Sequence, residues 1–290
     1  MKPIKYRWLK GLILWLCLLG CGVSPVLITP SATLPAIVLP PPTPVISAAA
    51  TATSLPLDTP IPPDTGWLLL RPGLEQRTLH LTDPTTGQQR ETITVLRLDP
   101  AFFAFDIGYR PGQPQSLIDW QAETGALLVV NGGYFTEQHL ATGLIIVAGQ
   151  ASGVSYEGFG GMVVINEAGL ALRSLAEQPY DGGETIAAAL QSFPLLVKPG
   201  GEPGFPEEDF RTSRRTVIAQ DNQGRVLFLV APQGTLTLFQ LSQWLVNSDL
   251  DLHIALNLDG GASTGLLLAD PPLHVTSFDL LPVVITVMAR

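Results

Sequence analysis

The hydrophobic pattern after residue 65 is mostly that of β-strands, because short apolar or alternating runs are separated by turn residues. Three pairs of runs are joined by short turn sequences and predict antiparallel pairs: 66–70 with 77–81, 162–166 with 170–173, and 216–219 with 226–230. The runs at 92–98 and 102–108 predict a further hairpin or two adjacent strands. Longer apolar runs predict buried strands at 126–130, 253–256 and 281–288.

Two helices interrupt this strand pattern. Ser116 followed by Asp119 resembles a capping box and predicts a helix that ends near Gly125. Thr237 followed by Gln240 predicts a second helix with its apolar residues on one face. Each helix leads into one of the buried strands. The expected fold class is therefore α+β: a strand-rich mixed sheet core with a few helices, forming a single domain over residues 66–290.

The first 65 residues have a different composition. Four cations precede an apolar stretch that ends in Leu-Leu-Gly-Cys at residue 21, which predicts a lipoprotein signal peptide over 1–20 and lipidation of Cys21. An ordinary signal peptide or an uncleaved anchor is the alternative. Residues 22–65 contain 11 prolines and no lysine or arginine, so 21–65 should be a lipidated cysteine and a disordered tether. We therefore expect an exported protein, held by lipid alone at the outer face of a bacterial membrane.

Charge and cysteine content limit the kinds of partner and metal site that the domain can have. The formal net charge is −9, and after residue 65 only 12 Lys and Arg residues stand against 23 Asp and Glu, which makes nucleic acid a poor partner. Cys17 and Cys21 are the only cysteines, so the expected domain has no thiolate metal site. The four histidines show no paired spacing. We expect no cofactor, and the sequence leaves open whether a metal ion is needed.

The turn that follows the strand at 253–256 carries the densest polar chemistry. Asp259 stands at the strand end, and Gly260 and Gly261 leave backbone amides unshielded by a Cβ. Ser263 and Thr264 follow within five positions. One acid, free amides and two hydroxyls could hold an oxyanion or phosphate beside a proton donor. The same residues would also suit an ordinary hairpin turn.

A similar arrangement ends the strand at 126–130. Asn131 is followed by Gly132 and Gly133, so a second strand delivers a short polar side chain and a glycine pair to its end. Glu137 is the nearest carboxylate to this motif and a candidate second acid.

Between the two motifs lies a cluster of cations. Arg211, Arg214 and Arg215 fall within five residues of an otherwise acidic domain. Guanidinium groups bind phosphate bidentately, so the cluster suits an anionic ligand. Pairing with the acidic residues 207–209 just upstream explains the cluster equally well.

Four segments of the chain, in this order, resemble the phosphodiester glycosidase family, whose members are relatives of the mannose 6-phosphate uncovering enzyme: 131–135 (NGGYF), 142–146 (TGLII), 215–219 (RTVIA) and 258–264 (LDGGAST). Residues 191–196 resemble the block that precedes the arginine in that family. The resemblance covers roughly residues 90–290.

This resemblance implies a hydrolase that cleaves a sugar-1-phosphodiester in a cell-surface or extracellular glycan. Asp259 would be the catalytic carboxylate, Arg215 would neutralise the phosphate, and Asn131 would bind a sugar hydroxyl or orient Asp259. The remaining implied substrate-binding residues are Gly132, Gly133, Gly143, Arg214, Gly260, Gly261, Ser263 and Thr264. Two other functions stay open: a non-catalytic glycan-binding lipoprotein, and a glycan hydrolase on the same scaffold whose substrate has no phosphate.

Overall fold

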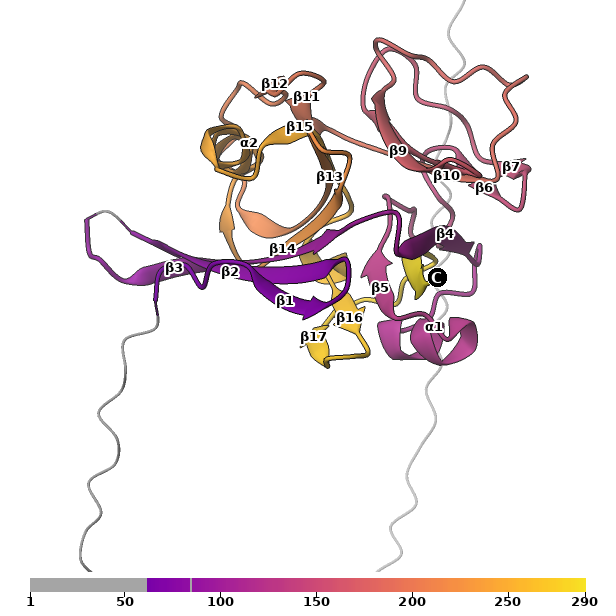
Figure 1. Ribbon diagram of the computed structural model, residues 1–290. Helices are drawn as coiled ribbons and strands as arrows, with labels where there is room; N and C mark the ends of the chain where they lie inside the picture. The colour runs from indigo at the N-terminus through magenta and orange to yellow at the C-terminus, as the bar shows by residue number, and fades with distance from the viewer. Residues whose placement is uncertain (1–61, 84) are drawn as a thin grey trace, which may run out of the picture. The chain divides into compact units, whose positions relative to one another are not determined.

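A computed structural model describes residues 62–83 and 85–290, which form three antiparallel sheets and two α-helices (Figure 1). The largest sheet has the strand order β1 (Leu68–Arg71), β2 (Leu74–Thr82), β3 (Gln89–Leu98), β14 (Val226–Leu236), β13 (Ser213–Asp221), β15 (Leu252–Asn257), β11 (Leu195–Lys198) and β12 (Glu202–Pro203). The second has the order β7 (Gln150–Ser152), β6 (Ile145–Val147), β10 (Ala188–Ser192), β8 (Gly161–Asn166) and β9 (Gly169–Ser174). The third has the order β17 (Leu273–Val275), β16 (Leu266–Leu268), β5 (Leu128–Asn131), β18 (Val283–Ala289) and β4 (Phe103–Tyr109). The predicted strand-rich α+β class is confirmed.

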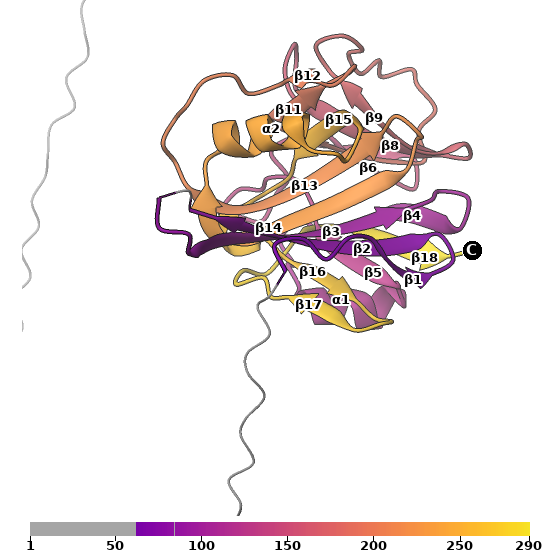
Figure 2. The same ribbon diagram turned by 60° about the vertical axis from the view of Figure 1, so that its left-hand side comes forward.

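All three sheets contribute to one apolar core. Phe228 of the largest sheet, Leu190 of the second and Val130 of the third belong to the same buried cluster. Alternate residues of the largest sheet face the other way, and Val217 and Leu229 pack with helix α2 (Leu238–Asn247) in a second cluster. Figure 2 shows α2 lying along this outer face. The core thus fixes the ends of strands from different sheets relative to one another.

Both predicted helices are confirmed, with their caps. The Ser116 hydroxyl accepts from the amide of Asp119 at the start of α1 (Leu117–Thr124), and Gly125 ends the helix in the left-handed conformation at φ 66°. Thr237 and Gln240 form a reciprocal capping box at the start of α2. The chain runs from α1 into β5 and from α2 into β15, as the sequence indicates.

The three predicted pairs form as β1–β2, β8–β9 and β13–β14, but the hairpin expected from 92–98 and 102–108 does not form. β3 pairs with β2 on one edge and β14 on the other, which leaves no edge for β4. β4 pairs instead with β18, at the edge of a different sheet. The two runs are consecutive in sequence, and the chain changes sheets between them.

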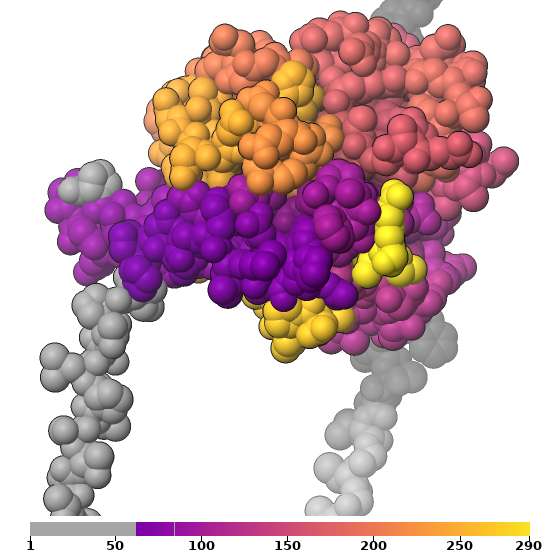
Figure 3. Space-filling view, viewed as in Figure 1, coloured from indigo at the N-terminus to yellow at the C-terminus, as the bar shows by residue number. Residues whose placement is uncertain are grey.

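Contacts with the domain begin slightly before residue 66. The amide of His80 donates to the carbonyl of Pro63 at 2.7 Å, and the amide of Thr65 to that of Thr78 at 3.0 Å. Asp64 pairs with the buried Arg77 through two oxygens. Figure 3 shows the N-terminal strands, in indigo, on the face of the domain between α2 and the β16–β17 hairpin. The predicted signal peptide, Cys21 and most of the predicted tether lie outside the described residues. None of the helices in the described ranges has the length and apolar character needed to cross a bilayer.

Candidate functional site

The two glycine motifs, far apart in sequence, meet at the ends of β5 and β15. The side-chain amide of Asn131 donates to the carbonyl of Asp259 at 2.8 Å. The amide of Asp259 in turn donates to the carbonyl of Gly132 at 3.0 Å. These bonds fix the backbone of the turn that carries the carboxylate.

Asn131 is fully buried and its side chain connects three segments. Besides its bond to Asp259, its Oδ1 accepts from the Thr216 hydroxyl at 2.8 Å and from the Gly265 amide at 3.0 Å. A side chain without exposure and with its polar atoms engaged has no contact left for a sugar. Of the two roles expected for Asn131, the geometry supports the orientation of Asp259.

The glycine-rich turn folds back as a 3₁₀ helix (Gly261–Ser263), with Gly261 in the left-handed region at φ 59°. The Gly260 amide donates to the carboxylate of Asp259 at 2.9 Å, so it holds the acid instead of being offered to a ligand. Thr264 is fully buried, and Ser263 is nearly so. In this conformation the Gly260 amide is bonded to Asp259 and the Thr264 side chain is buried, so their expected phosphate contacts stay predictions.

Asp259 has an unusual acidity. Burial is the largest cause and raises the pKa of Asp259 from 3.8 to about 6. Hydrogen bonds from Ser263 and from the Gly260 amide oppose this rise, and the nearby carboxylate of Asp279 adds to it. A carboxyl group that titrates near neutral pH can both accept and donate a proton at working pH.

Arg215 reaches the same strand ends from β13. Val217 is paired with Asn257, and the amide of Leu258 donates to the carbonyl of Thr216 at 2.9 Å, which continues the ladder. Continued one step past the end of β15, this register brings the backbone of Arg215 to the level of Asp259. The close approach of Arg214 to Gly260, where a Cβ would lie 2.7 Å from the Arg214 carbonyl, agrees with that register.

Arg215 is a buried cation bonded only to neutral groups. Its Nε donates to the carbonyl of Leu236 at 3.3 Å and its Nη2 to that of Arg211 at 2.7 Å. Among the described residues it belongs to no ion pair, so the pairing with residues 207–209 that the sequence left open is not formed. Burial lowers the pKa of Arg215, while Tyr134 and Asp209 raise it. A desolvated guanidinium without a carboxylate partner suits an anionic ligand.

The charges of Asp259 and Arg215 both affect the hydroxyl of Tyr134. Its hydroxyl accepts from the side-chain amide of the buried Asn257 at 2.6 Å. Burial, followed by the charge of Asp259, raises the pKa of Tyr134 to about 12, while Arg215 and the hydrogen bond from Asn257 oppose the rise. The phenol therefore remains protonated at neutral pH, and its neutral hydroxyl is near enough to both charged groups for each to affect it.

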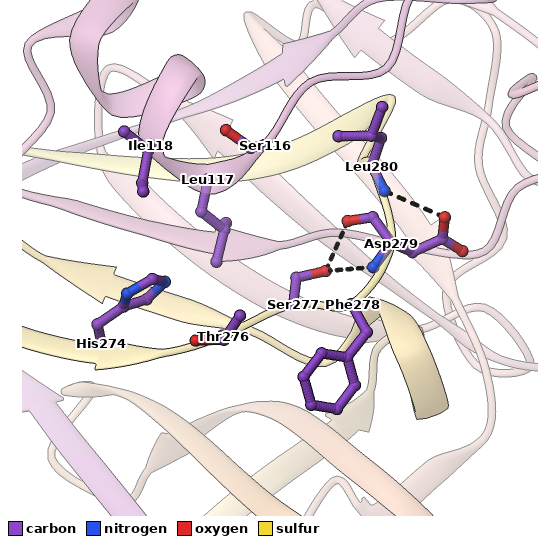
Figure 4. Close-up of a pocket in the computed structure, with 9 residues that line it drawn as sticks. All are labelled: Ser116, Leu117, Ile118, His274, Thr276, Ser277, Phe278, Asp279 and Leu280. Atoms are coloured by element: carbon purple, nitrogen blue, oxygen red, sulfur yellow. Dashed lines mark hydrogen bonds between the residues drawn. The ribbon is translucent and has the colours of Figure 1, made fainter. Parts of the chain in front are cut away.

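Arg214 is directed away from this cluster. It donates to the carbonyls of Pro232 at 3.1 Å and Thr276 at 2.7 Å and covers the ring of Phe278 at 4.3 Å. The loop 276–280 rests on the 3₁₀ turn, since the Phe278 amide donates to the Ala262 carbonyl at 2.8 Å. Figure 4 shows this loop lining a pocket, with Asp279 bonded to Ser277 and Leu280.

The loop also brings in a carboxylate that the sequence analysis missed. The charge of Asp279 raises the pKa of Asp259. Glu137, the candidate second acid, is exposed and is not among the groups that shift this pKa. No motif marks Asp279 in the sequence, because its position depends on the fold of the loop on the turn.

The remaining glycines of the predicted site are explained by packing. A Cβ on Gly133 would lie 2.7 Å from the carbonyl oxygen of Gln191, and one on Gly143 would lie 2.9 Å from the ring of Tyr156. Gly132 has a similarly close neighbour in Val283. These residues let strands approach each other around the site. In the described part of the chain, no three His, Cys, Asp or Glu residues are grouped so as to hold a metal ion.

Comparisons with known proteins agree with this architecture. The phosphodiester glycosidase family model matches residues 124–282, more than half of the chain, and includes the Asn131, Arg215 and Asp259 segments. The catalytic domain of zebrafish N-acetylglucosamine-1-phosphodiester alpha-N-acetylglucosaminidase has a similar structure, with a TM-score of 0.61 and 19% identity over 76% of this chain and 85% of that one. No significant match was found among curated proteins.

Two further solved structures share the fold. A hypothetical protein from Synechocystis has a TM-score of 0.55 at 15% identity, over 80% of this chain and 64% of that one. A protein from Burkholderia pseudomallei has a TM-score of 0.51 at 12% identity, over 68% of this chain and 74% of that one. At these identities the likenesses concern the fold.

Proposed function

Because this chain belongs to the phosphodiester glycosidase family, we propose that it hydrolyses a sugar-1-phosphodiester at the glycosidic bond. The substrate is a glycan of the cell surface or the surrounding medium. The similar zebrafish protein is named for an N-acetylglucosamine-1-phosphodiester, which supports this substrate class. The observation that carries the proposal is that Asp259, a carboxyl group of pKa about 6, and Arg215, a buried arginine without a carboxylate partner among the described residues, both act on the hydroxyl of Tyr134.

In the proposed reaction Asp259 acts on water. Its carboxylate removes a proton from a water molecule that attacks the anomeric carbon. The bond from that carbon to the phosphate oxygen breaks, and its electron pair leaves with the phosphate. A phosphate monoester is a good leaving group, so the second acid that most glycosidases need is less important here. A base with a pKa near the working pH is efficient in this role.

Arg215 and Tyr134 would stabilise the charge that develops. Arg215 faces the phosphate and binds the negative charge that accumulates on it as the glycosidic bond breaks. The protonated hydroxyl of Tyr134 donates a hydrogen bond to the same group or to the adjacent sugar. Asn131 does not contact substrate and holds the Asp259 backbone in place.

We also propose the cellular setting that the N-terminal sequence indicates. Residues 1–20 would direct export, Cys21 would carry the lipid, and residues 21–65 would separate the catalytic domain from the membrane surface. The support is the sequence pattern at residues 2–21 and the composition of the segment that follows.

The proposal is tested by assaying the full-length protein on N-acetylglucosamine-1-phosphodiesters and on p-nitrophenyl glycosides, which lack phosphate. We expect hydrolysis of the diesters, with release of free sugar and phosphomonoester. Asp259→Asn should lower turnover by about 10²–10⁴-fold. Asp106→Asn, which changes an exposed aspartate on β4, is the matched control and should retain activity. Faster hydrolysis of the neutral glycosides, or full activity in Asp259→Asn, would contradict the proposal.

A further inference from the structure

A second cavity, of about 400 Å³, lies beside the connection from β10 to β11, within the family-like segment 191–196, and contains none of the residues predicted to be catalytic or substrate-binding. Its lining includes Phe159, Phe193, Pro194, Glu177 and Lys198. The volume falls within the range of small-molecule sites in proteins. The lining combines aromatic rings with a few charged groups.

The aromatic residues form a continuous wall. The ring of Phe193 lies 5.8 Å from that of Phe159, edge to face, and 5.4 Å from that of Tyr156. The ring of Phe193 also lies 4.6 Å from that of Tyr134. Phe159 is 49% exposed, so much of its ring is open to a ligand. An exposed ring supported by other rings is held rigidly, which lowers the entropy lost on binding.

Hydrogen bonds connect this wall to the strand end that carries Asp259. The side-chain amide of Asn257 donates both to the Tyr134 hydroxyl at 2.6 Å and to the Phe193 carbonyl at 3.1 Å. Asn257 is two residues from Asp259 on the same strand end. A substrate whose scissile bond is at Asp259 can therefore extend along Tyr134 and Phe193 into the cavity.

The charged groups of the cavity are available to a ligand. Glu177 and Lys198 are exposed, and within the described ranges neither takes part in an ion pair or a side-chain hydrogen bond. One carries a negative and the other a positive charge, so the pair has no net preference for an anion or a cation. A carboxylate and an ammonium group do bind hydroxyls well.

We propose that this cavity is a binding subsite for a neutral pyranose ring of the substrate, next to the sugar or phosphate at Asp259. The apolar face of the ring stacks on Phe159 and Phe193, and its hydroxyls bond to Glu177 and Lys198. The proposal deepens the function proposed above and rests on it. It makes the protein selective for phosphodiesters within a longer glycan over those of a single sugar.

The test measures binding by titration calorimetry in full-length Asp259→Asn, so that turnover does not interfere. The reference probe is the methyl diester of N-acetylglucosamine-1-phosphate. Two further probes each carry one more sugar: in one, a glucose replaces the methyl group on the phosphate, and in the other, chitobiose replaces the N-acetylglucosamine. We expect one extension to strengthen binding. Phe159→Ala should weaken binding of that extended diester about tenfold, as expected for loss of an aromatic contact, and leave the affinity for the methyl diester unchanged. Phe102→Ala, which is 46% exposed in the β3–β4 connection, is the matched control.

Two further measurements separate the possible failures. A third probe, the phenyl diester of N-acetylglucosamine-1-phosphate, carries an apolar ring in place of the added sugar. Glu177→Gln should weaken binding of the sugar-extended diester but not of the phenyl diester. If Phe159→Ala weakens binding of the phenyl diester alone, the cavity binds an apolar group and the proposal is wrong. Neutral chitotriose is titrated into the otherwise unaltered protein. If it binds through Phe159 but no phosphodiester is hydrolysed, the subsite stands and the proposed reaction fails. If diesters are hydrolysed with no effect of the added sugar or of Phe159→Ala, the subsite is rejected.

Discussion

Replacing Asp259 by asparagine should make the protein more stable while it removes activity. The structure shifts the pKa of Asp259 from 3.8 to about 6 because burial disfavours the charged form. In the unfolded chain this group therefore loses its proton at lower pH than in the folded protein. The contribution of Asp259 to folding stability therefore falls as pH rises from about 4 to about 6, and it stays at the lower level above that range. An asparagine does not ionise and avoids this loss.

The size of the effect follows from the pKa. A difference of two pKa units corresponds to about 3 kcal/mol of unfolding free energy. Asp259 is partly exposed, which reduces that figure, so we expect a gain of about 1–3 kcal/mol for Asp259→Asn at pH 7–8. Asparagine keeps an oxygen that can accept from the Gly260 amide. For a domain of this size, 2 kcal/mol corresponds to a rise of about 4–8 °C in Tm.

The measurement is thermal unfolding of the native protein and the variant at intervals from pH 4 to pH 8. The gain should be small at pH 4, where Asp259 is protonated in the folded protein and only about half ionised in the unfolded chain, and greatest at pH 7–8. Asp106→Asn controls for the removal of one negative charge from an acidic domain. A gain of the same size at every pH, or a variant that is less stable at pH 8, would refute the reasoning and indicate that Asp259 has a structural role.

The proposed base predicts that kcat/KM on a phosphodiester rises with pH through about 6 and then levels off; a flat profile from pH 5 to pH 8 would count against Asp259 as the base. Arg215→Lys keeps the charge but loses the bidentate fork, so kcat on phosphodiesters should fall about 10²-fold, whereas Arg71→Lys on β1 should have no effect. Asp64→Asn should lower Tm by about 2–4 °C at pH 7, about 1 kcal/mol, because it breaks the pair with a buried arginine. The pKa of Asp64 is lowered to about 2, so calorimetry should find this difference above pH 4 and lose it as pH falls towards 2. Cys21→Ser should release the protein from the membrane fraction, and retention there would disprove the lipid anchor.

The local parts of this fold are readable from the sequence, and the non-local parts are not. Each helix cap is formed by residues close in sequence, Ser116 with Asp119 and Thr237 with Gln240. Both helices begin where these caps predict. Whether β4 pairs with β3 or with β18 depends on which edges are already occupied, and no local pattern encodes that choice.

The site shows the same division. Asn131, Arg215 and Asp259 can be identified from short motifs, and the fold brings Asn131 to Asp259. The acidity of Asp259 depends on burial and on Asp279, which are properties of the assembled structure. Gly132, Gly133 and Gly143, which the motifs suggest as ligand-binding residues, also permit close packing, and that requirement can be recognised only once the neighbouring atoms are known.

The bond between Asn131 and Asp259 has a consequence for how the protein acquires activity. It joins residues 128 positions apart, and the same side chain also requires β13 to be in register. Closing a loop of that length has an entropic cost that only the completed core offsets. A chain with its hairpins and helices formed but its sheets unassembled would therefore have secondary structure without a positioned carboxylate. During refolding, hydrolysis should return later than the circular dichroism signal, and it would report the finished topology.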